Sequence, residues 1–300
     1  MEKETTELKH IPVMMEEILK LLNPSPGQNF LDCTLGGGGH TAAILEKSAP
    51  NGKVFGIDRD LYAISRAKDR LKEFGNRVEY VHGKFSDVAE LISPNIWPSL
   101  QGALIDCGVS SFQLDSEERG FSFRFDSPLD MRMNPNDPIS AKEFLHQTRE
   151  EEIADTIYQL GEERNSRKIA KNIVLARSQH KLNTTFDLVE AVMKSFPPRY
   201  YYKTHPATKT FQAIRMKING EIEEIQTGLA ALMAKLPPKA KIVVITFHSL
   251  EDRLVKYIFR QAHAAKTAML LVKKPLMATR EESRENLRSR SAKVRGIELI

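Results

Sequence analysis

Asp32-Cys33-Thr34-Leu35-Gly36-Gly37-Gly38-Gly39-His40 is the segment from which the fold class follows most directly. It completes a short apolar run over residues 29–33 and leads into a segment with helical character over residues 40–47. Glycines between a strand and a helix let the backbone turn sharply and let a ligand approach the helix N-terminus. We therefore expect a strand, a ligand-binding loop and a helix in this order.

The same alternation continues on both sides of this stretch. Further apolar runs at residues 54–58, 78–81, 102–106 and 241–247 predict strands, and a helix with regular apolar spacing begins near residue 61. Short apolar strands that alternate with helices are typical of a parallel sheet covered on both faces. The fold class is therefore α/β.

The alternation is interrupted in the middle of the chain. After Gly108 the sequence is irregular, and residues 140–195 are helical in pattern without strand signals. A single helix is predicted over residues 207–236, before the most apolar strand. We expect one α/β domain made of residues 1–108 and 206–300, interrupted by a helical insertion at residues 109–205.

Composition narrows the class of protein. Of the 300 residues, 41% are hydrophobic and 28% are charged, which is enough apolar material for a buried core. Two cysteines, Cys33 and Cys107, exclude a disulfide scaffold and most cysteine-rich zinc sites, and we expect no metal. Without an apolar run of about 18 residues or an apolar signal core at the N-terminus, we expect a soluble cytoplasmic protein that does not act at a membrane.

Positive charge is concentrated in two segments. The first 163 residues have a net charge of −11, whereas residues 164–217 have +10 and residues 264–300 have +5. Concentrated positive charge attracts the phosphates of a nucleic acid, although a solvated basic helix face is the simpler alternative. The candidate RNA-binding residues are Arg164, Arg167, Lys168, Lys171, Arg177, Lys181, Arg288, Arg290, Lys293 and Arg295.

The glycine loop favours one class of cofactor. It has neither the Gly-x-Gly-x-x-Gly spacing of dinucleotide enzymes nor the Lys-Ser/Thr of a phosphate-binding loop, because position 40 is a histidine. An acid just before the glycines, here Asp32, is typical of loops that hold S-adenosylmethionine, whose ammonium group needs anionic or carbonyl partners. The alternative is a plain glycine-rich turn.

Two residues after the next strands complete a nucleotide-type site. Asp58 ends the second strand, where an acid accepts hydrogen bonds from both ribose hydroxyls of NAD or S-adenosylmethionine equally well. Phe85 follows the third strand and can pack on an adenine, or it can be an ordinary core aromatic.

Asp106 ends the fourth strand and is the candidate catalytic residue. A carboxylate there can accept hydrogen bonds from an exocyclic amine and orient it, or orient the cofactor. The adjacent Cys107 suggests the alternative of nucleophilic attack on C6 of a pyrimidine, but the Pro-Cys setting of that chemistry is absent and a buried thiol is favoured.

Taken together, these segments resemble the RsmH (MraW) family of bacterial methyltransferases, which use S-adenosylmethionine to modify N4 of a cytidine in small-subunit ribosomal RNA. The resemblance extends almost end to end and is carried by eight blocks in order. They are His10-Ile11-Pro12-Val13-Met14, residues 32–40, Gly56-Ile57-Asp58-Arg59-Asp60, residues 106–115, Arg119-Gly120-Phe121-Ser122-Phe123-Arg124, Pro128-Leu129-Asp130-Met131-Arg132-Met133, Thr210-Phe211-Gln212-Ala213-Ile214-Arg215 and residues 247–253.

The resemblance implies more than the residues alone. It implies a Rossmann-type class I methyltransferase sheet with a substrate-recognition insertion, and a substrate in the decoding region of 16S ribosomal RNA within the small subunit rather than DNA. It also implies cofactor contacts at Gly38, Gly39, His40, Asp58, Phe85, Asp106 and Gln113. The chain departs from the family pattern at Leu287, where a proline is usual, so the path of the basic C-terminal tail is open.

Two other functions share part of this evidence. An NAD-dependent oxidoreductase would use the sheet and Asp58, but it would need the dinucleotide glycine spacing. A non-catalytic RNA-binding protein would explain the charge but not the glycine loop. Binding of S-adenosylmethionine or of NAD separates all three.

Overall fold

The computed structural model describes residues 12–198, 202 and 204–300, so the His10-Ile11 part of the first family block lies outside the described residues. The chain forms two compact units. We call Met1–Gly108 together with Glu223–Ile300 the sheet unit, and Val109–Ile222 the helical unit.

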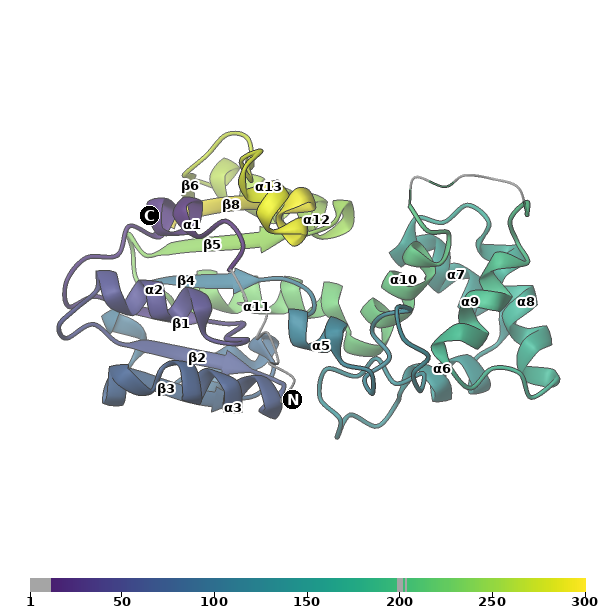
Figure 1. Ribbon diagram of the computed structural model, residues 1–300. Helices are drawn as coiled ribbons and strands as arrows, with labels where there is room; N and C mark the ends of the chain where they lie inside the picture. The colour runs from purple at the N-terminus through teal and green to yellow at the C-terminus, as the bar shows by residue number, and fades with distance from the viewer. Residues whose placement is uncertain (1–11, 199–201, 203) are drawn as a thin grey trace. The chain divides into compact units, whose positions relative to one another are not determined.

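The sheet unit is built on a mixed sheet. Its strands are β1 (Asn29–Asp32), β2 (Val54–Asp58), β3 (Val78–His82), β4 (Leu100–Asp106), β5 (Lys241–Thr246), β6 (Ala268–Leu270), β7 (Leu276–Met277) and β8 (Lys293–Leu299). Within the described residues the order is β3-β2-β1-β4-β5-β8-β6, and β7 pairs with β8 (Figure 1). The first five strands in this order are mutually parallel, and β8 is antiparallel to β5 and β6. The α/β class is therefore confirmed.

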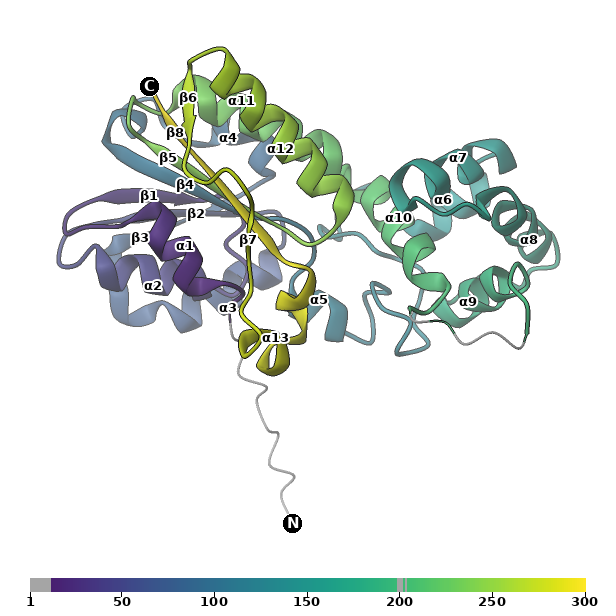
Figure 2. The ribbon, with the colours of Figure 1, turned by 90° about the horizontal axis from the view of Figure 1, so that it is seen from above.

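Helices cover both faces of this sheet. They are α1 (Met15–Leu22), α2 (Gly39–Lys47), α3 (Leu61–Arg70), α4 (Val88–Leu91), α11 (Glu221–Lys235) and α12 (Ser249–Ala264), with the short α13 (Glu282–Glu285) before β8. Figure 2 shows α1, α2 and α3 on one face and α11 and α12 on the other. Neighbouring residues of β5 pack into different layers, Val243 against the first and Val244 against the second. This is the period-two pattern of a strand buried on both faces.

The helical unit has its own core. Its helices are α5 (Ser111–Asp115), α6 (Ala141–Gln147), α7 (Glu150–Gly161), α8 (Ser166–Ser178), α9 (Thr185–Met193) and α10 (Ala207–Asn219). Phe144, Ile157, Ile173 and Leu188 are buried together at its centre. At Gly161 an added Cβ would lie 2.5 Å from the carbonyl oxygen of Lys209, so glycine is what lets α7 approach α10.

Two expectations about residues 207–236 were wrong. The single predicted helix is divided at Gly220, which adopts a left-handed φ of 61° and ends α10 before α11 begins. The second domain boundary also falls after residue 222 rather than after residue 205. The reason is that α10 buries Phe211 and Ile214 in the core of the helical unit.

The C-terminal tail forms part of the sheet. Leu287, the departure from the family pattern, is 60% exposed and begins a short 3-10 helix, Leu287–Ser291. The chain then enters β8 at Lys293 and pairs with β5, a strand that the sequence analysis did not predict. Other 3-10 helices lie at Lys72–Arg77, Phe85–Asp87 and Trp97–Ser99. No described helix is both long and apolar enough to cross a membrane.

Candidate active site

Three aspartates mark the carboxyl ends of three adjacent strands in the sheet unit. Asp58, Asp32 and Asp106 are the last residues of β2, β1 and β4, which are neighbours in the sheet. Ligands of doubly wound sheets bind at the carboxyl ends of the strands, where the connections diverge. The sequence placed an acid at each of these strand ends, and the sheet order brings the three together.

The glycine loop connects β1 to α2 and is held by Asp32. This carboxylate is buried, and its Oδ2 accepts a hydrogen bond of 2.6 Å from the Thr41 hydroxyl on α2. Its Oδ1 accepts from the Thr34 amide at 3.2 Å. Gly38 adopts a left-handed φ of 74° at the start of the helix, which favours glycine. Asp32 therefore shapes the loop rather than projecting into it, and burial raises its pKa.

Gly39 and His40 begin α2 against the N-terminal segment. A Cβ at Gly39 would lie 2.5 Å from the Pro12 ring, so this position has no room for a side chain. His40 is buried, and its Nε2 lies 3.0 Å from the carbonyl oxygen of Val13. Because a carbonyl oxygen only accepts, Nε2 donates this hydrogen bond. The other ring nitrogen, Nδ1, lies 3.9 Å from Oδ2 of Asp106.

Asp58 accepts hydrogen bonds from two backbone amides, one in the glycine loop and one just after β2. Its Oδ2 accepts from the Gly36 amide at 2.8 Å, and its Oδ1 accepts from the Asp60 amide at 2.8 Å. Asp60 itself caps α3 by accepting from the Tyr62 amide. Asp58 thus links the glycine loop to the β2 end. Burial, the largest effect, raises its pKa to about 6 despite these two hydrogen bonds.

Asp106 carries the least satisfied carboxylate of the three. Its amide donates a 2.6 Å hydrogen bond to the Thr34 hydroxyl, which fixes the end of β4 to the glycine loop. Its Oδ1 is buried and has no hydrogen-bond partner among the described residues. Burial raises its pKa to about 6, although the nearby His40 and Arg288 lower it. A buried acceptor without a donor is costly, so this atom is set to receive a donor from outside the chain.

Phe85 lies against α11 in the second helix layer. It is buried, and its amide donates to Oε1 of Glu224 at 3.1 Å. The other oxygen of Glu224 accepts from Arg59 at 2.9 Å, which ties the β2 end to the same carboxylate. A Cβ at Gly228 would lie 2.3 Å from the Phe85 ring, so glycine makes room for the aromatic ring. The position of Phe85 is therefore set by α11.

These groups match the chemistry of S-adenosylmethionine. A carboxylate such as Asp58 accepts from the two hydroxyls of a ribose, and the unpartnered Oδ1 of Asp106 accepts from an ammonium or an amine. A bound cation would also favour the ionised form of both acids, whose pKa values are raised by burial in its absence. The residues present therefore fit this cofactor.

The cysteines have no nucleophilic setting. Both Cys33 and Cys107 are buried and form no disulfide. Burial raises the pKa of the Cys33 thiol, and a protonated thiol is a poor nucleophile. The buried-thiol interpretation of Cys107 agrees with its 4% exposure.

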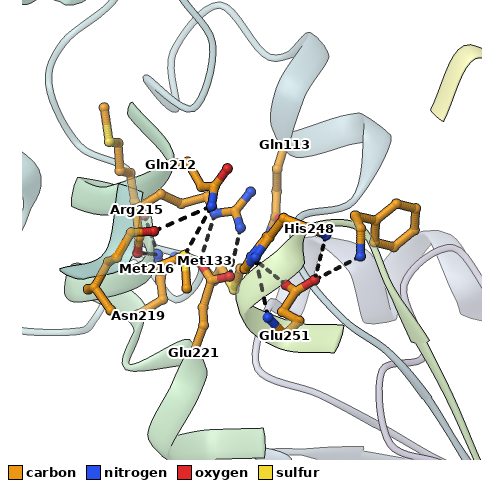
Figure 3. Close-up of polar contacts among 12 residues, drawn as sticks. Gln113, Met133, Gln212, Arg215, Met216, Asn219, Glu221, His248 and Glu251 are labelled. Atoms are coloured by element: carbon orange, nitrogen blue, oxygen red, sulfur yellow. Dashed lines mark hydrogen bonds and ion pairs between the residues drawn. The ribbon is translucent and has the colours of Figure 1, made fainter. Parts of the chain in front are cut away.

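Two further family blocks have local structural roles. In the sheet unit, Oε2 of Glu251 accepts from the amides of Phe247 and His248 at the start of α12 (Figure 3). In the helical unit, Arg215 makes two hydrogen bonds of 2.7 and 2.8 Å with Glu221, across the Gly220 break (Figure 3). These contacts fix the ends of α12 and α10.

Asn219 and Gln113 also anchor backbone within the helical unit. Asn219 accepts from the Met133 amide at 2.8 Å and donates to the Met131 carbonyl at 2.8 Å. Gln113 forms a capping box with Ser110 at the start of α5, accepting from the Ser110 amide at 3.0 Å. Its contact with the cofactor, which the resemblance implies, stays a prediction.

The predicted RNA-binding residues of the helical unit differ in how they are engaged. Arg177 donates to the carbonyls of Leu145 and Thr148 at the end of α6, so it has a structural role. Arg167 pairs with Asp155 at the exposed surface, and Lys168 donates to the Ser195 carbonyl at 3.3 Å. The remaining three, which are exposed, are Arg164, Lys171 and Lys181.

The predicted RNA-binding residues of the C-terminal tail are also engaged within the chain. Lys293 and Arg295 both pair with Asp252 on α12, at 3.3 and 2.7 Å. Arg290 donates to the Ser283 carbonyl. The guanidinium carbon of Arg288 lies 5.8 Å from the centroid of the Phe247 ring. RNA contact by these four side chains stays a prediction.

Sequence reasoning missed several residues that hold the site. The Thr34 hydroxyl accepts from the Asp106 amide, and the Thr41 hydroxyl donates to Asp32. The position of Thr34 within the glycine loop could have indicated its role. Glu224 is far along the chain from both residues that it contacts. No local pattern marks it, because its neighbours on α11 include two other glutamates.

Comparison with known proteins shows the family to which this chain belongs. The profile of the MraW methylase family matches residues 7–300. A ribosomal RNA small subunit methyltransferase H from Trichlorobacter lovleyi is 42% identical over 310 residues, covering 98% of this chain and 99% of that protein. The protein of the same name from Wolbachia sp. subsp. Drosophila simulans is 44% identical over 295 residues, covering 98% of this chain and 100% of that protein.

Proposed function

Because this chain belongs to the MraW methylase family, we propose that it transfers a methyl group from S-adenosylmethionine to N4 of a cytidine in the decoding region of small-subunit (16S) ribosomal RNA. The observation that carries the proposal is the buried, unpartnered Oδ1 of Asp106 at the carboxyl edge of the sheet. An acceptor in that place suits an amine substrate. The small ribosomal subunit is the proposed partner.

Asp106 has a defined task in this reaction. S-adenosylmethionine, when bound, supplies a methyl group on a positively charged sulfur. The exocyclic amine of cytidine is a poor nucleophile because its lone pair is delocalised into the ring. Asp106 would accept a hydrogen bond from that amine and hold it toward the methyl group, so that positioning rather than a strong base supplies the rate. As the nitrogen–methyl bond forms, the methyl–sulfur bond breaks, the sulfur leaves as a neutral thioether, and the amine gives up one proton to water. The Thr34 hydroxyl keeps the Asp106 backbone in place.

The remaining residues bind and orient the cofactor. Asp58 would accept from the ribose hydroxyls, while the left-handed turn at Gly38 and the tight packing at Gly39 shape the loop beside it. Phe85, which α11 holds in place, would pack beside the adenine. His40 lies beside Asp106, and Gln113 of the helical unit is a proposed additional contact.

Substrate contact is assigned to exposed cations. In the helical unit the proposal rests on Arg164, Lys171 and Lys181, together with Arg167 and Lys168, whose partners are a surface carboxylate and one carbonyl. Arg177 contributes to the fold of this unit in any case. Phosphate contacts of this kind position an RNA and weaken with salt, but they do not select a base.

Two measurements test the proposal against its alternatives. Isothermal titration with S-adenosylmethionine and with NAD should show binding of the first only, and binding of NAD alone would indicate an oxidoreductase. Small subunits incubated with methyl-labelled S-adenosylmethionine should then gain label in their RNA. RNA binding without methyl transfer would indicate a non-catalytic protein, and Asp106→Asn should bind the subunit but transfer far less label.

A further inference from the structure

A further basic surface lies on the sheet unit, over a run of the chain that begins before the basic segment at residues 264–300. From Arg253 to Arg280 the sequence contains seven lysines and arginines and no aspartate or glutamate. Arg253, Lys256 and Arg260 lie outside the two basic segments, because the acids of α11 and of the first turn of α12 offset their charge. The other four cations belong to the basic segment at residues 264–300. The run covers most of α12 and the chain that follows it.

Four of the cations in this part of the sheet unit meet at one pocket. Lys256 and Arg260 come from α12, Lys273 follows β6, and Arg295 comes from β8, over an apolar floor that includes Phe259 and Leu270. We call Lys256, Arg260, Lys273 and Arg295 the α12 patch. Residues from one helix, one strand and the loop after β6 therefore converge, which a merely solvated helix face does not require.

The charge of the α12 patch is only partly neutralised within the chain. Arg295, whose side chain is 12% exposed, is held by Asp252 through two hydrogen bonds of 2.7 and 3.3 Å. No ion pair or hydrogen bond joins the side chains of Lys256, Arg260 or Lys273 to another part of the chain that the structure describes. Like charges that converge repel one another, and an anion between them relieves this repulsion.

We propose that the α12 patch binds backbone phosphates of the ribosomal RNA substrate, next to the nucleotide that is methylated. The inference rests on the proposed function for the identity of the RNA. Lys256 and Arg260 are four residues apart, or about 6 Å along the helix, and Lys273 and Arg295 lie beside them at the same pocket, so the α12 patch can contact more than one phosphate. A strand of linked phosphates matches such a row better than a single free anion does.

The position of the patch suits this partner. Helix α12 begins at Ser249, directly after the carboxyl end of β5, which lies next to β4 and Asp106 in the sheet. Lys256 follows Ser249 by seven residues, so it lies roughly 10 Å along the helix from the carboxyl edge of the sheet. Nucleotides that flank the target base can therefore reach the patch.

The test removes three charges and compares two surfaces. The triple variant Lys256→Gln, Arg260→Gln, Lys273→Gln is compared with a control, Lys47→Gln, Lys53→Gln, Lys72→Gln, whose residues are exposed on other parts of the sheet unit. The probes are purified small subunits and a short single-stranded RNA, titrated over a series of potassium chloride concentrations. Titration with S-adenosylmethionine should give wild-type affinity for both variants, which shows that they are folded.

Near physiological salt the patch variant should bind both RNA probes at least about 10-fold more weakly than the wild type does. On single-stranded RNA, the slope of log affinity against log salt concentration should be smaller by about 0.7 for each lost phosphate contact. The control should stay within about twofold of the wild type. Wild-type affinity and slope in the patch variant would overturn the proposal, as would an equal loss in the control. Poly-glutamate binding that competes with RNA at equal affinity would also overturn it, by indicating a protein partner.

The proposed function is tested separately by methyl transfer with the wild-type enzyme. If the wild type fails to methylate small-subunit RNA while the patch variant loses RNA affinity, the patch stands and the proposed function fails. If the wild type methylates the RNA and the patch variant binds RNA normally, the proposed function stands and the α12 patch proposal fails.

Discussion

Replacement of Asp106 by asparagine tests whether the buried charge of this carboxylate destabilises the ligand-free protein. Burial raises the pKa of Asp106 from 3.8 to about 6 in the folded protein. The protonated carboxyl is thus the form that the fold favours. Protonated Asp106 contributes fully to the free energy of unfolding below pH 3.8, the pKa of the carboxyl in the unfolded chain. This contribution is lost as the pH rises through about 6, the pKa in the folded protein. Asparagine does not titrate, so it avoids this loss.

The size of the effect follows from the shift. A difference of about two pKa units corresponds to about 3 kcal/mol in the free energy of unfolding, and the partial exposure of the side chain reduces this to about 2–3 kcal/mol. Without ligand, Asp106→Asn should therefore be more stable than the wild type by about 2–3 kcal/mol near pH 7.5, and this advantage should disappear near pH 4.

Urea unfolding of the cofactor-free protein measures this difference. The single tryptophan, Trp97, is buried in the sheet unit, so its fluorescence reports the unfolding of that unit. The wild type and the variant are compared at about pH 4 and about pH 7.5, and Asp69→Asn, at an exposed position of α3, serves as the control. A difference between Asp106→Asn and wild type that is the same at both pH values would refute the reasoning.

Four other results are expected. Asp58→Ala should weaken S-adenosylmethionine binding by about 2–3 kcal/mol, typical for the loss of charge-assisted hydrogen bonds, and an unchanged dissociation constant in titration would remove Asp58 from the site. The dissociation constant should fall as the pH rises from about 5 to about 7, because burial places the pKa values of Asp58 and Asp106 at about 6 and a cationic ligand needs them ionised; a flat profile would contradict this. Gly228→Ala places a methyl group against the Phe85 ring, so it should destabilise the protein by about 1–3 kcal/mol and weaken cofactor binding, whereas Thr227→Ala at an exposed neighbour should not. Neutralising Arg167, Lys168 and Lys171 together should weaken small-subunit binding and reduce its salt slope by up to about one per lost phosphate contact while leaving the affinity for S-adenosylmethionine unchanged; wild-type binding would mean that this face is only solvated.

The parts of the site that sequence reasoning found are those with local signals. The acids Asp32, Asp58 and Asp106 each follow an apolar strand, and parallel strands place their carboxyl ends on one edge of the sheet. The first domain boundary, after Gly108, was proposed from the change in pattern there, and the two units also divide at that point.

The parts that sequence reasoning missed depend on contacts between distant segments. Glu224 joins Arg59 to Phe85, and no spacing in the sequence relates these three positions. Helix α11 continues the apolar spacing of α10, so the sequence pattern predicted one helix. It did not reveal the left-handed turn at Gly220, although glycine is the usual residue at such a break. Strand β8 has alternating burial that its sequence, rich in charged residues, conceals. The α12 patch was missed because a sum of charges over a segment hides where each side chain lies.

Nucleoside analysis of small-subunit RNA is the most direct test of methyl transfer to N4 of a cytidine. Small subunits from a strain that lacks the homologous activity are incubated with the wild-type enzyme and methyl-labelled S-adenosylmethionine, and the RNA is digested to nucleosides for mass spectrometry. We expect label in N4-methylcytidine, with greatly reduced label for Asp106→Asn. Label in a C5-methylated pyrimidine or in another nucleoside, or RNA that stays unlabelled while the enzyme binds its cofactor, would contradict it.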